Sequence, residues 1–90
     1  MPRNRKSALM RAAENGDVDE VFRILNGRHG YFINGGDEYG TTPLHYAAYE
    51  GHWDVIELLV SWGASKKVVN NNGRTPWNVA DPSVKHLLTW

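Results

Sequence analysis

Apolar residues in the middle of the chain recur at the spacing expected of buried helices. A helix is predicted to begin at Pro43, because proline loses no needed donor at the first helical position and Thr42 can cap it. Gly51 ends this helix. The next helix carries an apolar stripe and ends before Gly63; the stripe consists of Val55, Ile56, Leu58, Leu59 and Val60. The pattern therefore predicts two short helices, the second buried on both flanks.

The same pattern recurs along the chain. Residues 7–16 align with residues 42–51 at an offset of 35, and residues 75–80 align with residues 42–47 at an offset of 33. The similarity between the first two units extends into their second helices, where Asp19, Val21, Ile24 and Leu25 match Asp54, Ile56, Leu59 and Val60. A period of this length predicts a stack of structural repeats, each with two short helices.

Two segments between the helix pairs are rich in Gly and Asn. They span residues 30–41 and 63–75. Turn-forming residues within them predict tight turns at residues 37–40 and 70–73. We therefore expect both segments to form finger-like loops.

The middle unit resembles one ankyrin repeat at nearly every signature position. The residues that carry the resemblance are Gly40-Thr41-Thr42-Pro43-Leu44-His45-Tyr46-Ala47-Ala48, Gly51-His52, Ile56-Glu57-Leu58-Leu59-Val60 and Gly63-Ala64. Residues assigned to the structural signature are Thr42, Pro43, Leu44, His45, Ala47, Gly51, Thr75 and Pro76. The resemblance implies an all-α ankyrin-repeat solenoid of paired antiparallel helices joined by β-hairpin-like finger loops. It also implies a hydrogen bond between the His45 ring and Thr42.

The domain organisation follows from the repeats. The predicted parts are a basic flexible N-terminal tail (1–6) and an ankyrin repeat domain (7–90), which divides into repeat 1 (about 7–40), repeat 2 (about 41–73) and a truncated capping repeat (about 74–90). About three units are the practical minimum, because each buries its faces against neighbours. The Met at the start and the short closing unit favour a complete small protein over a fragment.

Composition narrows the class of protein. With 90 residues, of which 41% are hydrophobic and 22% charged, the chain is expected to fold as one small domain. Net charge is zero, but residues 12–57 are acidic, which argues against nucleic-acid binding. No apolar run is long enough to span a membrane, and the first residues lack the apolar core of a signal peptide, so a cytoplasmic or nuclear location is expected.

No catalytic, metal or cofactor site is predicted. The chain has no Cys, and its His residues lie in four different segments without metal-ligand spacing: His29, His45, His52 and His86. No Ser has a His and an acid at the spacing of a nucleophile motif, and Ser83 is expected to cap the last helix. Residues 35–39 nearly match the signature of diguanylate cyclases, but the repeat register places them in a finger, and the chain is too short for that enzyme.

Candidate function therefore lies on the surface. In ankyrin arrays the finger tips and the exposed side of each first helix form a concave face for partners. The partner-binding residues that the resemblance and the sequence indicate are Glu38, Tyr39, Thr41, Tyr46, Tyr49, Glu50, Trp53, Asn71, Asn72 and Arg74. This set is aromatic and acidic, which favours a partner protein with a basic surface. For Tyr46, a partly buried packing role is an open alternative.

Four Trp residues are many for so short a chain. Trp77 is expected in the core, where it would fill space left by the shortened last unit. Trp62 is expected to cover the next unit or to form a second contact site, and Trp90 to pack over Leu87 or to fray. Trp53 stands where an aliphatic residue is more usual and is expected to extend the concave face.

These observations predict a protein–protein interaction module that acts as an adaptor, a regulator or an inhibitor, without a cofactor. We expect a monomer. Two alternatives remain open: a structural protein that self-associates through Trp62 or Trp90, and a regulatory ankyrin fragment of a larger enzyme or channel.

Overall fold

The computed structural model describes residues 6–27 and 32–89. Its helices are α1 (Ala8–Asn15), α2 (Val18–Leu25), α3 (Pro43–Glu50), α4 (Trp53–Ser61), α5 (Pro76–Val79) and the 3-10 helix η1 (Pro82–Leu87). These two stretches contain no β-strand, so the all-α prediction is confirmed. The predicted tail at residues 1–5, His29 and Trp90 lie outside the described residues.

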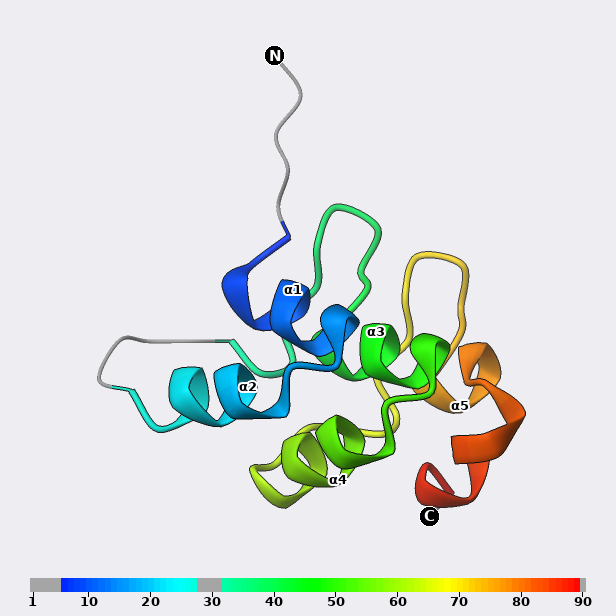
Figure 1. Cartoon of the computed structure of the whole chain (residues 1–90). Coiled ribbons are helices and arrows are strands. Elements are labelled where there is room, and N and C mark those ends of the chain that lie inside the picture. The colour runs from blue at the N-terminus through cyan, green and yellow to red at the C-terminus, as the bar shows by residue number, and fades with distance from the viewer. Residues whose placement is uncertain (1–5, 28–31, 90) are drawn as a thin grey trace.

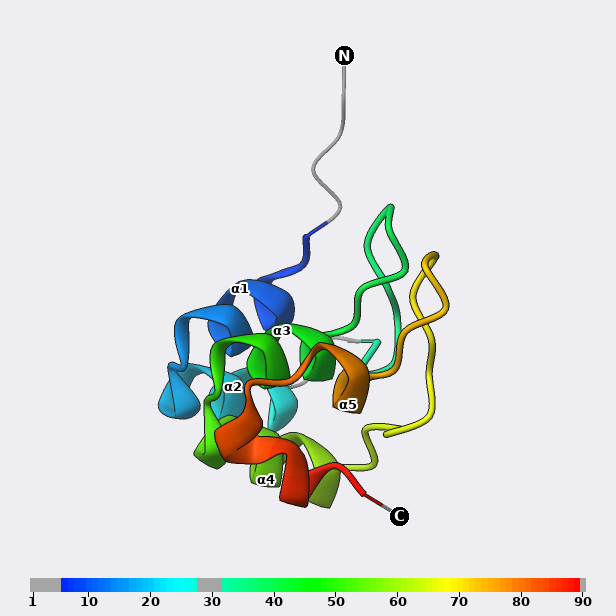
Figure 2. The ribbon, with the colours of Figure 1, turned by 90° about the vertical axis from the view of Figure 1, so that its right-hand side faces the viewer.

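The helices form two rows (Figure 1). One row contains α1, α3 and α5, each packed on the next, and the other contains α2, α4 and η1. Loops of residues 32–42 and 62–75 connect successive units and project side by side beyond the first row (Figure 2). Stacked helix pairs with projecting loops make a short solenoid, as the repeats predict.

Each helix of the first row begins with the same capping device. The side chains of Ser7, Thr42 and Thr75 each accept a hydrogen bond from the backbone N–H three residues later. The residue at that third position reaches back to the N–H of the cap, and it is Met10, His45 or Asn78 in turn. Three different side chains thus make one local structure.

Small residues allow the two rows to approach closely. Ala12 and Ala13 of α1, like Ala47 and Ala48 of α3, are fully or nearly fully buried. Larger side chains from the second row complete the core: Val21, Leu25, Val55, Ile56, Leu59, Val84 and Leu88. The first helix of each of the first two units ends where Gly16 or Gly51 takes a left-handed conformation that other residues rarely adopt.

Polar bonds tie neighbouring units together. The His52 ring bonds through Nε2 to the Glu14 carbonyl oxygen at 2.9 Å, and the His45 ring bonds through Nε2 to the Arg74 carbonyl oxygen at 2.9 Å. Because a carbonyl only accepts, both Nε2 atoms are the protonated ones. Nδ1 of His45 is therefore the acceptor for the Thr42 amide and hydroxyl groups, and its buried ring is fully bonded while neutral.

Two expectations about the end of the chain require correction. Trp77 is not a core residue, since 39% of it is exposed. Its counterpart Leu44 is on α3, which packs between α1 and α5, whereas α5, which holds Trp77, packs against α3 among the described residues. The last helix is capped by Asp81 rather than Ser83. The N-terminal tail remains a prediction, and Lys6, its last residue, forms an ion pair with Glu14.

Candidate functional site

The base of the first finger is organised by Asp37. Its Oδ1 accepts hydrogen bonds from the Tyr39 amide at 2.9 Å and from the Thr41 amide at 3.0 Å. Asn70 holds the second finger in the same way, through the amides of the residues two and four positions later. The turn geometry therefore repeats with the sequence, and the two residue types are interchangeable in that role.

The second oxygen of Asp37 links the finger to the first row of helices. The Tyr46 hydroxyl of α3 donates a hydrogen bond to Oδ2. Burial raises the pKa of Asp37, but the bonds from Tyr46, Thr41 and Tyr39 outweigh it and leave that pKa below its usual value. Burial and the same carboxylate raise the pKa of Tyr46 far above its usual value. At neutral pH, Asp37 is therefore an ionised carboxylate and Tyr46 is a neutral phenol.

Lys6 lies against the same tyrosine. Its Nζ donates to Glu14 Oε1 at 2.7 Å and sits 4.6 Å from the centre of the Tyr46 ring. Its charge also acts on Asp37, whose pKa it lowers. An ammonium group over the face of an aromatic ring is attracted by the ring quadrupole. Lys6, Glu14, Asp37 and Tyr46 therefore form one connected polar cluster.

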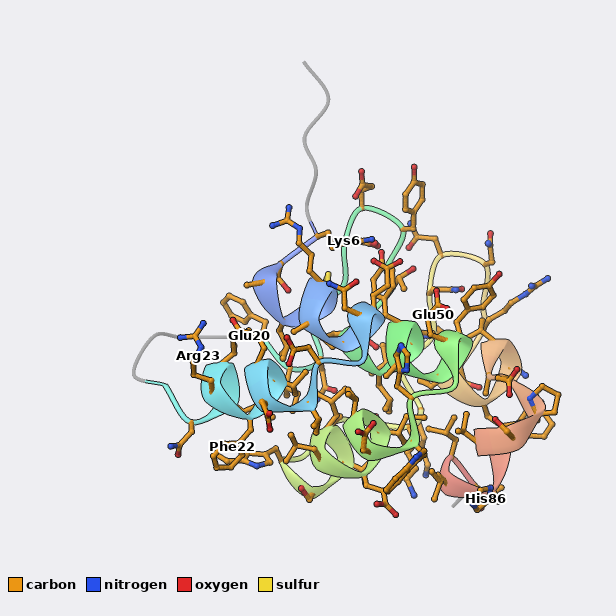
Figure 3. All side chains as sticks on the ribbon, viewed as in Figure 1. Lys6, Glu20, Phe22, Arg23, Glu50 and His86 are labelled. Atoms are coloured by element: carbon orange, nitrogen blue, oxygen red, sulfur yellow. The ribbon has the colours of Figure 1, made fainter. Side chains whose placement is uncertain are left out.

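Beside this cluster is a pocket of about 230 Å³. It is lined by Glu14, Thr41, His45, Tyr46, Tyr49, Glu50, Asn70 and Val79. Four of the predicted partner-binding residues, Thr41, Tyr46, Tyr49 and Glu50, thus meet here. Tyr49 is 68% exposed and Tyr46 is half-buried. In Figure 3, Lys6 and Glu50 lie on one side of the first row of helices, while Phe22 and His86 lie on the opposite side of the molecule.

The finger tips bring further predicted residues together. The Asn71 amide donates to the Tyr39 carbonyl oxygen at 2.9 Å, and Asn71 Nδ2 donates to the Glu38 carbonyl oxygen at 3.0 Å. All three side chains are exposed, as are those of Asn72 and Arg74 on the second finger. The two fingers are therefore joined by hydrogen bonds and present their side chains on adjacent tips.

Trp53 is placed apart from this pocket. It begins α4 and is 61% exposed, but it does not line the pocket. Trp62 is on the second row of helices, where its ring meets Phe22 edge to face with centroids 6.4 Å apart. Both rings of this pair are partly exposed. The described ring contact of Trp62 is thus with the preceding unit, and the two roles expected for Trp62, a cover over the next unit and a second contact site, remain predictions.

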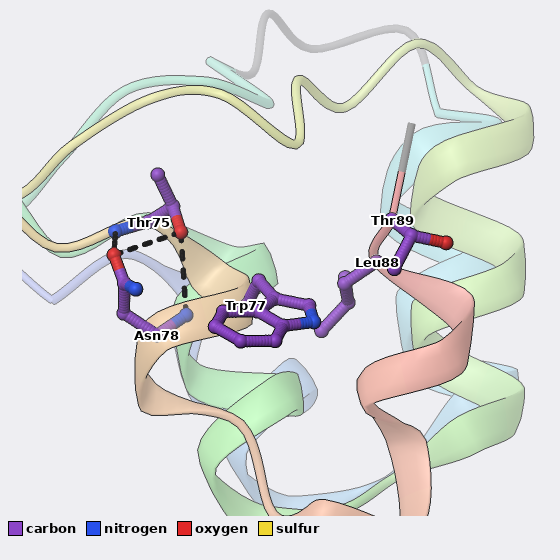
Figure 4. Close-up of a pocket in the computed structure, with 5 residues that line it drawn as sticks. All are labelled: Thr75, Trp77, Asn78, Leu88 and Thr89. Atoms are coloured by element: carbon purple, nitrogen blue, oxygen red, sulfur yellow. Dashed lines mark hydrogen bonds between the residues drawn. The ribbon is translucent and has the colours of Figure 1, made fainter.

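A second hollow of about 450 Å³ lies at the end of the stack (Figure 4). It is lined by Thr75, Trp77, Asn78, Leu88 and Thr89. Lys85 Nζ lies 3.8 Å from the centre of the Trp77 ring and donates to the Trp77 carbonyl oxygen at 2.7 Å. The lysine thus covers part of an indole that is otherwise partly exposed.

The described part of the chain holds no group of three His, Cys, Asp or Glu residues suited to a metal ion. None of its helices is long and apolar enough to cross a membrane. What the surface does offer is exposed aromatic area beside carboxylates, which suits recognition of another macromolecule.

Two-helix units with paired fingers and a buried capping His define a helical repeat protein. The sequence model of the family described as ankyrin repeats (3 copies) matches residues 2–71. The chain belongs to the ankyrin-repeat family, whose repeats form a protein-interaction module without catalytic residues of their own. The ankyrin repeat domain of Bcl-3 has the same fold, with a TM-score of 0.85 and 30% identity over 96% of this chain and 37% of that chain.

Curated relatives share the module in different contexts. Human protein phosphatase 1 regulatory subunit 27 is 34% identical over 91% of this chain and 52% of its own length. Human oxysterol-binding protein-related protein 1 is 33% identical over 96% of this chain and 9% of its own length. Mouse 2-5A-dependent ribonuclease is 39% identical over 82% of this chain and 10% of its own length. The chain thus spans about half of the first relative and a small part of the others.

Sequence reasoning missed Lys6, Glu14 and Asp37 as members of the site. One signal was present for Asp37, because the alignment places it at the position of Asn70 and both residue types favour turns. Glu14 aligns with Tyr49 of the next unit. Tyr49 is a predicted partner-binding residue because of its aromatic ring, which Glu14 does not share. Nothing in the repeat pattern indicates Lys6, which precedes the first unit.

Proposed function

We propose that this chain binds another protein and acts as an adaptor, a regulator or an inhibitor. The proposed binding surface, termed here the concave face, consists of Glu38, Tyr39, Thr41, Tyr46, Tyr49, Glu50, Asn71, Asn72 and Arg74, with Trp53 as an extension. The observation that supports it best is the exposure of two tyrosines, 66% for Tyr39 and 68% for Tyr49, beside the exposed acids Glu38 and Glu50. Rigid aromatic side chains give contact area at low entropic cost.

The charge of this surface favours a basic partner surface, which would also speed the encounter. A regulatory role is consistent with the phosphatase regulatory subunit among the relatives. We place the interaction in the cytoplasm or nucleus, since a chain without Cys suits a reducing compartment. The proposed state of the free chain is a monomer.

Affinity capture with the full chain as bait tests the proposal. The double variant Tyr49→Ala with Glu38→Lys is expected to lose a protein that the wild-type chain retains, while its helical signal and melting temperature stay near those of the wild type. Glu57→Lys, at an exposed position of α4, is the control for the charge change and is expected to retain it. If the double variant captures the same proteins in the same amounts, the concave face is not the binding surface.

A second candidate function is self-association through the second row of helices. The edge-to-face pair of Phe22 and Trp62, each at least 38% exposed, is the observation that favours it. Sedimentation over a range of concentrations separates the two candidates. A monomer at every concentration contradicts self-association, whereas a dimer that Trp62→Ser dissociates supports it.

A further inference from the structure

The chain already holds a cationic side chain at the edge of the pocket on its concave face. Lys6 Nζ bonds to Glu14 at 2.7 Å and lies 4.6 Å from the centre of the Tyr46 ring. Both Glu14 and Tyr46 also line the pocket. The structure thus shows that this carboxylate and this ring can hold a cation together.

The rest of the pocket extends the same chemistry. Tyr49 and Glu50, at the end of α3, line it as well. Glu50 is exposed and lies on the same side of the molecule as Lys6 (Figure 3). The pocket is thus lined by two carboxylates and two phenol rings. This lining suits the guanidinium group of arginine better than it suits a neutral side chain, because the guanidinium is planar, donates several hydrogen bonds, pairs with carboxylates and stacks on aromatic faces.

We propose that this pocket receives an arginine side chain of the protein partner, and that Lys6 occupies its Glu14 and Tyr46 edge in the free chain as an internal competitor. The inference rests on the proposed protein-binding function and assigns the chemistry of the partner at one place on the concave face. Binding then requires that the partner's arginine displace Lys6. Because the bound state competes with an internal contact, removal of the Lys6 charge increases the apparent affinity.

A small probe tests the pocket without knowledge of the partner. N-acetyl-L-arginine methylamide carries the guanidinium, and N-acetyl-L-citrulline methylamide is its neutral counterpart of nearly the same shape. NMR spectroscopy follows the binding. In the free protein the ring current of Tyr46 is expected to shield the protons next to Lys6 Nζ. Titration with the arginine probe is expected to shift the ring signals of Tyr46 and Tyr49 saturably and to move those Lys6 signals to unshielded positions. The citrulline probe is expected to produce neither change.

Variants separate the pocket from its competitor. Lys6→Gln is expected to bind the arginine probe about threefold more tightly, and Lys67→Gln, which removes the same charge elsewhere, is expected to bind it as the wild type does. Glu50→Gln removes a carboxylate outside the Lys6 contact and is expected to weaken binding, whereas Glu57→Gln is expected to leave it unchanged.

The outcomes distinguish this inference from the proposed function. If the arginine probe gives no saturable shift even with Lys6→Gln, or if Glu50→Gln leaves its affinity unchanged, the pocket assignment is wrong, while partner capture by the concave face can still stand. If the probe binds as expected but capture is insensitive to the concave-face variants, the proposed function fails and the cation site remains. If Lys6→Gln binds the probe no more tightly than Lys67→Gln, the competitor role of Lys6 is wrong.

Discussion

The Tyr46 hydroxyl donates a hydrogen bond to Asp37 Oδ2 and thereby fastens the first finger to helix α3. Tyr46→Phe removes this one bond and retains the ring. Because the acceptor is a charged and nearly buried carboxylate, we expect the free energy of unfolding to fall by about 1–2 kcal/mol. Urea denaturation measures the loss. Tyr49→Phe is the matched control at an exposed ring and should change stability by less than about 0.5 kcal/mol; equal effects of both variants would contradict the role of the bond.

Asp37 has two functions that substitution can separate. Asp37→Asn is expected to retain the finger turn, since Asn70 makes the same two backbone contacts in the next finger, but to weaken the bond from Tyr46 by removal of the charge. Asp37→Ala loses both and leaves two amides without their acceptor, which should cost about 1–3 kcal/mol in all. Denaturation curves for the two variants should therefore differ, with the alanine variant the less stable. Equal losses in the two variants would show that the charge, not the turn, is the larger contribution, because both variants lack the charge.

The helices could be predicted from the sequence because their determinants are local. Thr42 and Thr75 cap helices whose bonds all lie within four residues, and Gly51 ends a helix through its own backbone conformation. The repeat register then predicts which helices stack. Such features recur in each unit, so that one unit supports the assignment of the next.

The polar cluster could not be predicted because it occurs once and does not recur from unit to unit. The counterpart of Tyr46 is Arg11 in the first unit and Val79 in the last, so the alignment carries no signal for a bond to the finger. The contact between Lys6 and Tyr46 joins a residue that precedes the first unit to the second unit, and its formation depends on how the first two units stack. The exposure of Trp77 could not be predicted from the alignment either. Its position matches that of buried Leu44, but burial depends on how the neighbouring units pack against the position.

The pH dependence of stability should report the buried ring of His45. Burial lowers the pKa of His45 below its ordinary value of 6.5, although the bond to the Arg74 carbonyl oxygen raises it. The unfolded chain therefore takes up a proton at a higher pH than the folded chain does. The free energy of unfolding is expected to be unaffected by this group above about pH 7 and to decrease as the pH falls below 6.5 towards the folded pKa.

One substitution tests this assignment with little loss of structure. His45→Asn copies Asn78, which accepts from the Thr75 amide at 2.8 Å in the equivalent cap. We expect this variant to be less stable at pH 7, because its bond to Arg74 is lost, and to lose less stability between pH 7 and pH 5. His86→Asn removes an exposed His and should retain the wild-type slope. An unchanged slope in His45→Asn would assign the titration to another group.

Truncation of the side chain to alanine should lower the free energy of unfolding by very different amounts at equivalent positions of the repeat. Leu44→Ala removes a side chain that is 1% exposed, and we expect a loss of about 3 kcal/mol. Trp77→Ala removes a larger side chain at the matching position, yet the loss should be only about 1 kcal/mol, because 39% of it is exposed and its other contacts include a half-buried lysine. Chemical denaturation of both variants is the measurement. A larger loss for Trp77→Ala would show that the indole supports the end of the stack more than its burial indicates.

The aromatic pair on the second row of helices should contribute to stability within one molecule. The rings of Phe22 and Trp62 meet at an interplanar angle of 84°, the edge-to-face geometry that aromatic quadrupoles favour. A double-mutant cycle with Phe22→Leu and Trp62→Leu is expected to give a coupling energy of about 0.5–1 kcal/mol. Measured at low and at high protein concentration, the coupling should be the same if the contact is intramolecular. A coupling that grows with concentration would instead indicate that this pair forms the contact between two copies of the chain.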